Sequence, residues 1–233
     1  MNKTINIEPL ARVEGHGGIE VVIKDRKVRD IRVQIFEGPR LMEQITLGKT
    51  PEEAVSITSR ICAICFVSHR LADIRAHEKA LGIKPGEKTR LLRKLCHYGE
   101  IIESNALHYY LLALPDYLGY PDAVTMLAKY PGLVKGGLGL KKYGNMIMES
   151  IAGRRVHGEN MGIGGFGRIP SIEGLERLKS RARELVPVIT EGLEAWTGIK
   201  IPAQCERETV FMSLSSRDSE YPFISDRIMV SDG

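Results

Sequence analysis

Residues 50–81 read TPEEAVSITSRICAICFVSHRLADIRAHEKAL, and the fold is built around this stretch. Thr50 is a typical N-cap residue, Pro51 suits the first helical position, and Glu53 completes a capping box with Thr50. Gly82 follows the last apolar position and is typical of a helix end. We therefore predict one long helix that starts after Thr50 and ends just before Gly82.

The segment before this helix has the pattern of a β-hairpin. Residues 19–23 form an apolar run and residues 28–35 alternate between apolar and polar, with a charged segment at 24–27 between them. Gly38 and Pro39 interrupt the strand pattern, and a short helix is expected over residues 40–47.

The segment after the long helix is predicted to be mainly helical. The fold class is therefore α+β and mostly helical, a bundle of long helices with a small N-terminal β-hairpin. In chain order we expect a second long helix from Lys88 to about Leu114, short helices punctuated by Pro115, Pro121 and Pro131, a helix at about 140–151, a glycine-rich loop at 153–167, a helix from Ser171 to about Trp196, and short strands at 209–214 and 224–230.

Composition excludes several classes of protein. The 233 residues are 43% hydrophobic and 27% charged, as in an ordinary globular domain or two small ones. No apolar run approaches the roughly 20 residues of a membrane span, and the N-terminus lacks the apolar core of a signal peptide. The formal charge is +4, and runs such as residues 84–94 and 177–184 mix basic and acidic residues, which is typical of solvated helix faces. We therefore expect a cytoplasmic protein that neither spans a membrane nor binds nucleic acid.

Two of the four cysteines are the candidate metal ligands of this sequence. Cys96 and Cys205 are isolated, whereas Cys62 and Cys65 form a Cys-x-x-Cys pair, which in a cytosolic protein indicates metal binding or redox activity. On a helix this pair shares one face, His69 follows on the same side, and the charge of Arg60 favours the thiolates. Two thiolates on one face can hold one side of a soft metal centre.

The spacing alone leaves other interpretations open. A structural zinc site needs four ligands, usually from two such pairs, and only one pair is present. A thioredoxin-like dithiol lies at a helix N-terminus after a strand, whereas this pair falls inside the predicted helix. The two cysteines can also be buried apolar residues without a chemical role.

Three further segments resemble one known family. Arg12-Val13-Glu14-Gly15-His16, Glu37-Gly38-Pro39-Arg40-Leu41-Met42-Glu43 and the Arg60–His69 motif are similar to the signatures at the start of nickel–iron hydrogenase large subunits. Arg154, His157 and Gly164-Gly165 resemble a later loop of the family, so the likeness covers essentially residues 1–233, as the N-terminal portion of the large-subunit domain. Ala63, where the family usually has Gly, and Gly158, where it often has Pro, are mild departures. The Glu-Gly-Pro-Arg form is most similar to the cytosolic, multi-subunit enzymes of archaea and some bacteria.

The resemblance implies a role for each matching residue. Cys62 would be a terminal nickel ligand, and Cys65 would bridge nickel to an iron that carries cyanide and carbon monoxide. Glu14 matches a proton-relay carboxylate, for which burial and negative neighbours would raise the pKa toward neutrality. His69 would hydrogen-bond the bridging sulfur, and Glu43 matches a carboxylate that binds magnesium or a similar hard cation.

Each of these residues also has a structural alternative. Glu14 can cap a turn, His69 can be a satisfied core histidine, and Glu43 can lie on the surface of its short helix. The glycines of residues 162–167 match the dinucleotide fingerprint G-x-G-x-x-G, but the βαβ context that this fingerprint requires is missing. His97, His108 and the tyrosines of the second long helix are expected to pack rather than to bind.

The family's centre needs four thiolates, and the second Cys-x-x-Cys pair is absent from this sequence. We therefore expect the chain to be inactive alone and to be completed by a missing C-terminal half or by a complementing chain. Its expected partners are an iron–sulfur small subunit and electron-acceptor subunits, and the complete enzyme would oxidise dihydrogen reversibly to protons and electrons. The alternatives are a non-catalytic assembly module related to the quinone-site subunit of complex I, and a simple metal-binding protein that uses Cys62, Cys65 and His69.

Overall fold

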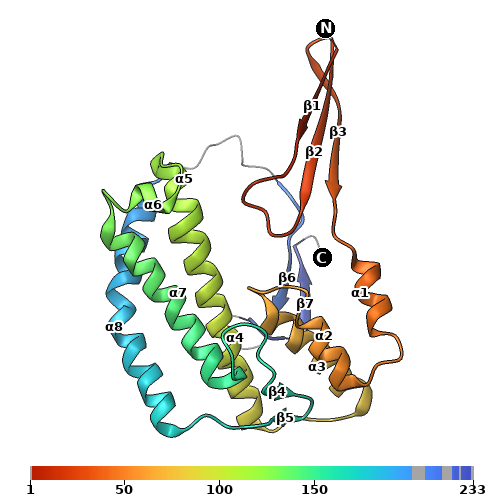
Figure 1. Cartoon of the computed structure of the whole chain (residues 1–233), viewed down its shortest axis with the longest axis vertical. Coiled ribbons are helices and arrows are strands. Elements are labelled where there is room, and N and C mark those ends of the chain that lie inside the picture. Colours follow the sequence, from red (N-terminus) through yellow and green to blue (C-terminus); the bar gives the residue numbers. More distant parts are fainter. Residues whose placement is uncertain (1, 201–207, 217–221, 226, 232–233) are drawn as a thin grey trace. The chain divides into compact units, whose positions relative to one another are not determined.

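The computed structural model describes residues 2–200, 208–216, 222–225 and 227–231. The chain divides into two compact units, residues 1–48 and residues 49–233. Figure 1 shows strands in the first unit and mainly long helices in the second. The predicted class, mostly helical with small antiparallel sheets, is confirmed.

The first unit is a three-stranded antiparallel sheet followed by one helix. Strands β2 (Gly17–Lys24) and β3 (Lys27–Ile35) form the predicted hairpin, and β1 (Lys3–Ile7) adds a strand that the sequence analysis missed. Partners across the strands share a face, so the row Ile5–Val21–Ile31 is apolar, whereas its neighbour Asn6–Glu20–Arg32 is polar. Helix α1 (Pro39–Thr46) confirms the short helix predicted after the Gly-Pro break.

The predicted long helix is two helices. Helix α2 (Pro51–Thr58) starts with the expected capping box, in which the Glu53 N–H donates to Thr50 Oγ1 over 3.2 Å and the Thr50 N–H donates to the Glu53 carboxylate over 2.8 Å. Helix α3 (Phe66–Leu81) ends at Gly82, in left-handed conformation with φ of 69°, as predicted. The prediction of one continuous helix was wrong, because residues 59–65 form a turn between α2 and α3.

Hydroxyl groups and distant side chains stabilise this interruption. The Ser59 hydroxyl donates to the Ser56 carbonyl over 2.8 Å, and the Thr58 hydroxyl donates to the carboxylate of Asp73 on α3 over 2.7 Å. Hydroxyls at such positions compete with the backbone bonds that would continue a helix. The break therefore depends on contacts between α2 and α3 that a single-helix reading of the sequence cannot show.

Two long helices form the centre of the second unit. Helix α4 (Glu87–His108) continues through a π-helical turn, η1 (Tyr109–Ala113), into α5 (Leu114–Leu118), and α6 (Ala123–Met126) is a single turn. Helix α7 (Pro131–Ala152) packs along α4 and is longer than the helix predicted at about 140–151, because Pro131 lies in its first turn, where proline is tolerated, and does not interrupt it. A Cβ atom at Gly144 would contact the backbone oxygen of Gly99, so glycine at this crossing permits the close approach of the two helices.

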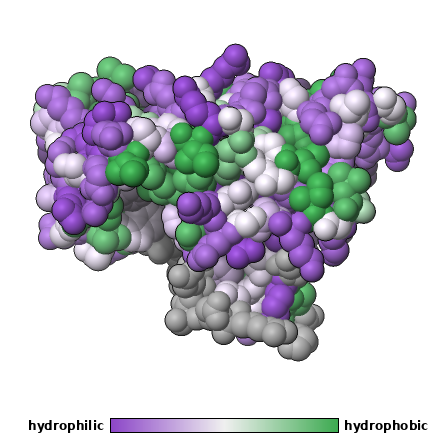
Figure 2. All heavy atoms as spheres, turned by 90° about the horizontal axis from the view of Figure 1, so that it is seen from below, coloured by the Kyte–Doolittle hydropathy of each residue, from purple (hydrophilic) through white to green (hydrophobic). Residues whose placement is uncertain are grey.

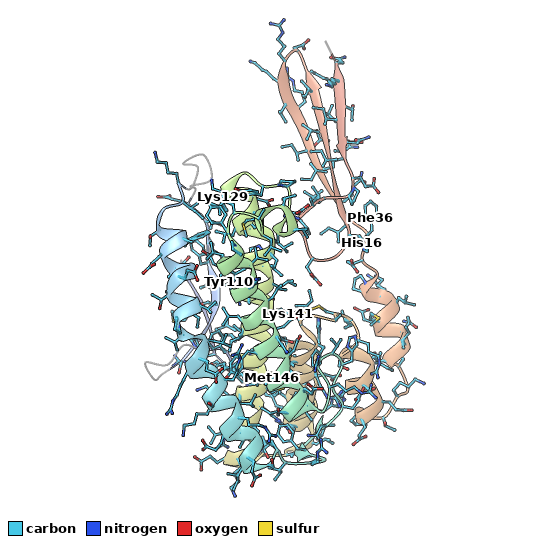
Figure 3. The ribbon with its side chains drawn as sticks, turned by 60° about the vertical axis from the view of Figure 1, so that its left-hand side comes forward. His16, Phe36, Tyr110, Lys129, Lys141 and Met146 are labelled. Carbon is cyan, nitrogen blue, oxygen red and sulfur yellow. A yellow bond between two sulfur atoms is a disulfide. The ribbon has the colours of Figure 1, made fainter. Side chains whose placement is uncertain are left out.

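The core gathers where α3, α4, η1 and α7 meet. Phe66, Ile74, Leu114 and Ile151 are fully buried, and each such side chain contributes roughly 1.5–3 kcal/mol through the hydrophobic effect. Tyr110 lies among the helices in Figure 3, and its hydroxyl donates to the Val188 carbonyl on α8 over 3.0 Å. The prediction that the tyrosines of this helix pack is confirmed for Tyr110.

The remaining elements follow the predicted order. The glycine-rich loop contains a small hairpin, β4 (Met161–Gly162) and β5 (Gly165–Phe166), and α8 (Ile172–Thr197) starts at Ser171, whose hydroxyl accepts from the Gly174 N–H. Strands β6 (Met212–Ser215) and β7 (Arg227–Val230) pair antiparallel within the predicted tail. None of the helices in the described part of the chain combines the length and the apolar character that a bilayer crossing demands. On the face in Figure 2, hydrophobic and hydrophilic residues alternate in small groups.

Candidate metal centre

Cys62 and Cys65 lie in the turn between α2 and α3, and their side chains converge. Cys65 is the N-cap residue of α3, their Cα atoms are 5.5 Å apart, and their sulfurs are joined as a disulfide. Both residues are partly exposed. The prediction that they share one helix face was wrong, because Cys62 precedes the helix, but the turn brings the two sulfurs together.

The backbone of the turn is placed to stabilise negative charge on one sulfur once the disulfide is reduced. The Cys65 N–H donates a hydrogen bond to Cys62 Sγ over 3.1 Å, at the N-terminus of a 16-residue helix. A helix N-terminus carries partial positive charge and lowers the free energy of a thiolate. The pair was predicted to lie inside a helix, which argued against a thioredoxin-like dithiol, but the structure places it at a helix N-terminus, as in that class. The element before the pair is helix α2 and not a strand, which still separates it from that class.

A buried carboxylate from α4 caps the same helix end. Glu100 accepts from the N–H of Val67 over 2.6 Å and from the N–H and hydroxyl of Ser68. Burial raises the pKa of Glu100 more than these hydrogen bonds lower it. His97 continues the chain of contacts, with its Nε2 3.2 Å from the Ser68 hydroxyl, and burial lowers its pKa. Glu100 therefore holds the start of α3, one turn from Cys65, in place.

Two arginines that flank the cysteines converge on Glu159 of the glycine-rich loop. Arg60 Nη1 and Arg70 Nη1 each lie 2.7 Å from a different oxygen of this carboxylate, and Arg70 Nε also donates to the Met161 carbonyl over 2.6 Å. Burial would raise the pKa of Glu159, but the positive charge of Arg70 and the hydrogen bonds from both arginines lower it. The guanidinium of Arg60, predicted to favour the thiolates, is thus held by this carboxylate and by Ser56.

His157 fastens the glycine-rich loop to the turn from a second point. Its Nδ1 lies 2.9 Å from the Ser59 carbonyl, and its ring packs edge-on against Phe66, the first residue of α3. Sequence reasoning noted His157 only through the family likeness and missed Glu159 and Arg70. The contact between Arg70 and Glu159 joins residues about 90 positions apart, and no sequence spacing predicts a contact over that separation.

His69 lies one turn after Cys65 on α3, where its backbone N–H donates to the Cys65 carbonyl over 3.3 Å. Its ring makes no hydrogen bond to either sulfur among the described residues. No group of three or more histidine, cysteine and acidic side chains suited to a metal occurs in the described ranges either. Among the described residues, Cys62, Cys65 and His69 do not meet as such a group.

The other predicted residues belong to the first unit. Glu37 joins the two motifs there, since its carboxylate accepts from the His16 N–H over 2.9 Å, and His16 and Phe36 appear together in Figure 3. Glu14 is exposed in the turn before β2, contrary to the burial expected for a proton relay, and Glu43 is exposed on α1. The roles of Glu14 and Glu43 remain predictions.

The glycine-rich segment 162–167, which matches the dinucleotide fingerprint, forms hydrogen bonds with side chains of α3 and α4. The Gly164 N–H donates to the Glu78 carboxylate over 2.7 Å, and the Gly162 carbonyl accepts from Arg93 over 3.0 Å. Burial would raise the pKa of Glu78, but hydrogen bonds from Arg93 and Gly164 lower it. These backbone groups are thus hydrogen-bonded within the protein.

The isolated cysteines do not join the pair. Cys96 is fully buried on α4 as a free thiol, and burial raises its pKa to about 12, which makes it unreactive at neutral pH. Cys205 lies outside the described residues.

The fold and the site define a chain that presents two converging cysteines at a helix N-terminus. Comparison with known proteins shows which family this chain resembles. Residues 40–131 match the nickel-dependent hydrogenase family, and residues 4–37 match a group described as HoxL-like. The alpha subunit of sulfhydrogenase 2 from Pyrococcus furiosus is 50% identical over 182 residues, which cover 78% of this chain and 44% of the relative. The alpha subunit of sulfhydrogenase 1 from the same organism is 39% identical, over 98% of this chain and 54% of the relative.

The structural comparison agrees. A crystal structure of an NAD+-reducing [NiFe]-hydrogenase in the H2-reduced state superposes with a TM-score of 0.87 at 28% identity, over 98% of this chain and 54% of that chain. The likeness to nickel-dependent hydrogenase large subunits that the sequence motifs predicted is therefore confirmed. The chain spans about half the length of the curated relatives that it matches.

Proposed function

We propose that this chain is part of a hydrogenase large subunit and that Cys62 and Cys65 hold one side of a nickel–iron centre. The observation that carries the proposal is the convergence of two partly exposed sulfurs at the N-terminus of α3, with the Cys65 N–H directed at Cys62 Sγ. The relatives named above, all hydrogenases, support the same centre.

Cys62 and Cys65 are suitable ligands for a soft metal once their disulfide is reduced. Two electrons convert the disulfide into two thiolates, and neighbouring thiolates are suitable ligands for nickel and iron. Two thiolates do not complete a nickel–iron pair, and the described residues bring no third ligand to them. We therefore propose that further thiolates come from a portion of the large subunit that this chain does not include, or from a complementing polypeptide.

The residue roles follow the family likeness. Cys62 is proposed as a terminal nickel ligand and Cys65 as the bridge to iron, whose cyanide and carbon monoxide ligands come from outside the protein. When bound, the centre supplies the reversible heterolytic splitting of dihydrogen. Glu14 is proposed to accept the proton, and His69 to donate a hydrogen bond to the Cys65 thiolate.

Two further residues complete the proposed site. Glu43 is proposed as an oxygen ligand for magnesium or a similar hard cation. Arg60 is proposed to favour the thiolates through its charge, while its contact with Glu159 keeps it beside the turn.

The proposed partners are an iron–sulfur small subunit, which receives the electrons, and electron-acceptor subunits beyond it. The names of the relatives describe them as subunits of larger enzymes, which supports an assembly of this kind. A cytoplasmic location is proposed from the likeness to the archaeal enzymes.

Metal analysis of the native assembly tests the proposal. The protein is purified with its accompanying subunits under anaerobic, reducing conditions, and nickel, iron and zinc are quantified for the wild type and for Cys62→Ser and Cys65→Ser. We expect stoichiometric nickel in the wild type and its loss in both variants, whereas Cys96→Ala, which removes the buried thiol, should retain it.

Other outcomes identify the alternatives. Stoichiometric zinc that disappears in Cys62→Ser would support a simple metal-binding protein. A stable assembly without nickel in the wild type would support the non-catalytic module and refute the proposed centre.

A further inference from the structure

An apolar groove lies between α4, η1 and α8 of the second unit. Its volume is about 490 Å³. The last turns of α4 form one wall, and the C-terminal half of α8 forms the other, with Ile189, Gly192, Leu193 and Trp196. None of the described lining residues belongs to the turn that carries the cysteines, so the groove is separate from the proposed metal centre.

Helix α8, at the edge of the helical bundle in Figure 1, has a second apolar side besides the one that packs on the core. Leu185 is buried, whereas an exposed row is formed by Val186, Ile189, Leu193 and Trp196, which are 56%, 46%, 62% and 37% exposed. Their spacing of three, four and three residues places the row on one side of the helix, as in the seam of two packed helices. The row extends over about 15 Å of helix, and Val186 is not among the residues that line the groove. A small molecule in the groove would therefore leave part of the row uncovered, whereas a helix laid along α8 would cover all of it.

Four polar side chains at this surface are already hydrogen-bonded within the protein. The Asn105 amide donates to a carbonyl of its own helix over 2.8 Å, and the Tyr109 hydroxyl donates to the Gly192 carbonyl over 2.5 Å. Beside the row, the hydroxyls of Thr190 and Thr197 donate to carbonyls of α8 over 3.3 and 2.8 Å. An apolar partner can cover such groups at little cost, because their desolvation leaves no donor unpaired. The surface is therefore suited to an apolar occupant.

Aromatic contacts and hydrogen bonds fix the position of the row. The Trp196 ring packs edge-on against the rings of Tyr109 and Tyr117, with ring centroids 5.7 and 5.8 Å apart. The Tyr110 hydroxyl donates to the Val188 carbonyl over 3.0 Å and so ties η1 to α8. A wall that is already ordered loses little entropy when a partner binds, and tryptophan and tyrosine often contribute much of the binding energy at an interface. The groove and the row are therefore a preformed surface.

We infer that the groove and the row are covered by the apolar side of a helix from the portion of the large subunit that this chain does not include. The inference rests on the proposed function, which makes the chain one part of that subunit. The solved hydrogenase that superposes over 98% of this chain is matched over only 54% of its own length, so nearly half of that chain lies outside the match. That portion supplies the length of polypeptide from which such a helix can come.

The exposed area disfavours a second copy of this chain as the occupant. Four side chains of about 200 Å² each, about half exposed, offer on the order of 400 Å², whereas each partner of a stable complex buries roughly 800 Å². Two copies that met only at this row would therefore be held weakly. A segment that also contacts the chain elsewhere does not need the row to supply the whole interface.

Photo-crosslinking within the native assembly tests the inference. The photoreactive amino acid p-benzoylphenylalanine replaces Leu193, which is 62% exposed, in the protein purified with its accompanying subunits, and peptide mass spectrometry identifies the segment that it captures. We expect a segment of the large subunit outside residues 1–233, with apolar residues at helical spacing. Ile189→Glu in the same background should lower the yield of this cross-link about tenfold, because a carboxylate would have to be buried against the captured helix.

The same photoreactive amino acid in place of Val124 on α6 is the matched control. Val124 is a hydrophobic residue that is 78% exposed and lies outside the groove, so this position should not capture the same segment. Capture of another subunit or of a second copy of this chain at position 193 would overturn the inference. The absence of any cross-link at position 193 would overturn it as well.

Cys62→Ser, combined with the photoreactive amino acid at position 193, separates the inference from the proposed metal centre. We expect this variant to lose nickel and to keep the cross-link, because the groove does not include the cysteine turn. A wild-type assembly that gives the cross-link but lacks nickel would refute the metal centre and support the inference. An assembly that contains nickel but gives no cross-link would refute the inference alone.

Discussion

Replacement of Glu100 by alanine should destabilise the protein by about 3 kcal/mol, because it removes the acceptor that caps α3. The Val67 N–H is fully buried, and a buried donor without an acceptor costs roughly 1–3 kcal/mol. Ser68 is exposed, so water replaces part of its two contacts and their loss costs roughly 0.5–1.5 kcal/mol. The two contributions together give the expected magnitude.

Replacement of Glu100 by glutamine distinguishes the effect of the negative charge of Glu100 from the effect of the hydrogen bonds that it accepts at the start of α3. The glutamine oxygen can still accept from the Val67 N–H, and its amide can donate to the Ser68 hydroxyl. Burial raises the pKa of Glu100 above its ordinary value of 4.5, so the folded protein binds this proton more tightly than the unfolded chain does. The resulting stabilisation is fully present below pH 4.5 and is lost as the pH rises through the folded pKa. Glutamine does not titrate, so Glu100→Gln should gain stability relative to the wild type as the pH rises through that window.

Urea unfolding followed by circular dichroism between pH 4 and pH 8 measures both effects. Glu176→Ala, a change at an exposed position on α8, serves as control and should alter the free energy of unfolding by less than about 0.5 kcal/mol. An alanine variant as stable as the control would refute the capping role of Glu100. A constant difference between Glu100→Gln and the wild type at every pH would refute the argument from its raised pKa.

Two further outcomes are expected. Gly144→Ala should lower the free energy of unfolding by roughly 1–3 kcal/mol, because the added Cβ would contact the Gly99 backbone oxygen. Gly165→Ala should change it far less, because a Cβ at Gly165 would meet only open space. Equal melting temperatures of the two variants would contradict the close packing at Gly144. After reduction, iodoacetamide at pH 8 should alkylate Cys62 and Cys65 but not Cys96, because Cys96 is buried and its pKa is raised to about 12. Peptide mass spectrometry measures the modification of each cysteine. Alkylated Cys96 in the folded protein would contradict the argument from its burial.

The local features of the fold could be predicted from sequence because they are decided within a few residues. The capping box at Thr50 and Glu53, the left-handed Gly82 and the Ser171 cap each satisfy backbone groups of their own helix end. The same holds for the alternation that forms the hairpin of β2 and β3. The identities of the two converging cysteines were also visible, since their spacing and neighbours are properties of the chain itself.

The position of those cysteines was decided by the tertiary structure. Residues 51–81 satisfy the local rules for one helix. The interruption at 59–65 is stabilised by groups outside it: the Asp73 carboxylate accepts from Thr58, Glu159 contacts Arg60, and Glu100 caps the start of α3. The extended α7 has the same cause, because its glycines weaken the helix locally and gain their value only in close packing, as Gly144 does against α4 and Gly136 does against Val188 of α8.

Sequence alone thus identified the helix caps at Thr50, Gly82 and Ser171 and the Cys-x-x-Cys pair. Only the tertiary structure decided that Cys62 and Cys65 meet in a turn at a helix N-terminus and that Arg60 and Arg70 share the Glu159 carboxylate. The physical reason is distance along the chain. A hydrogen bond between residues three apart is encoded in local propensity, whereas one between residues about 90 apart exists only after the helices have packed.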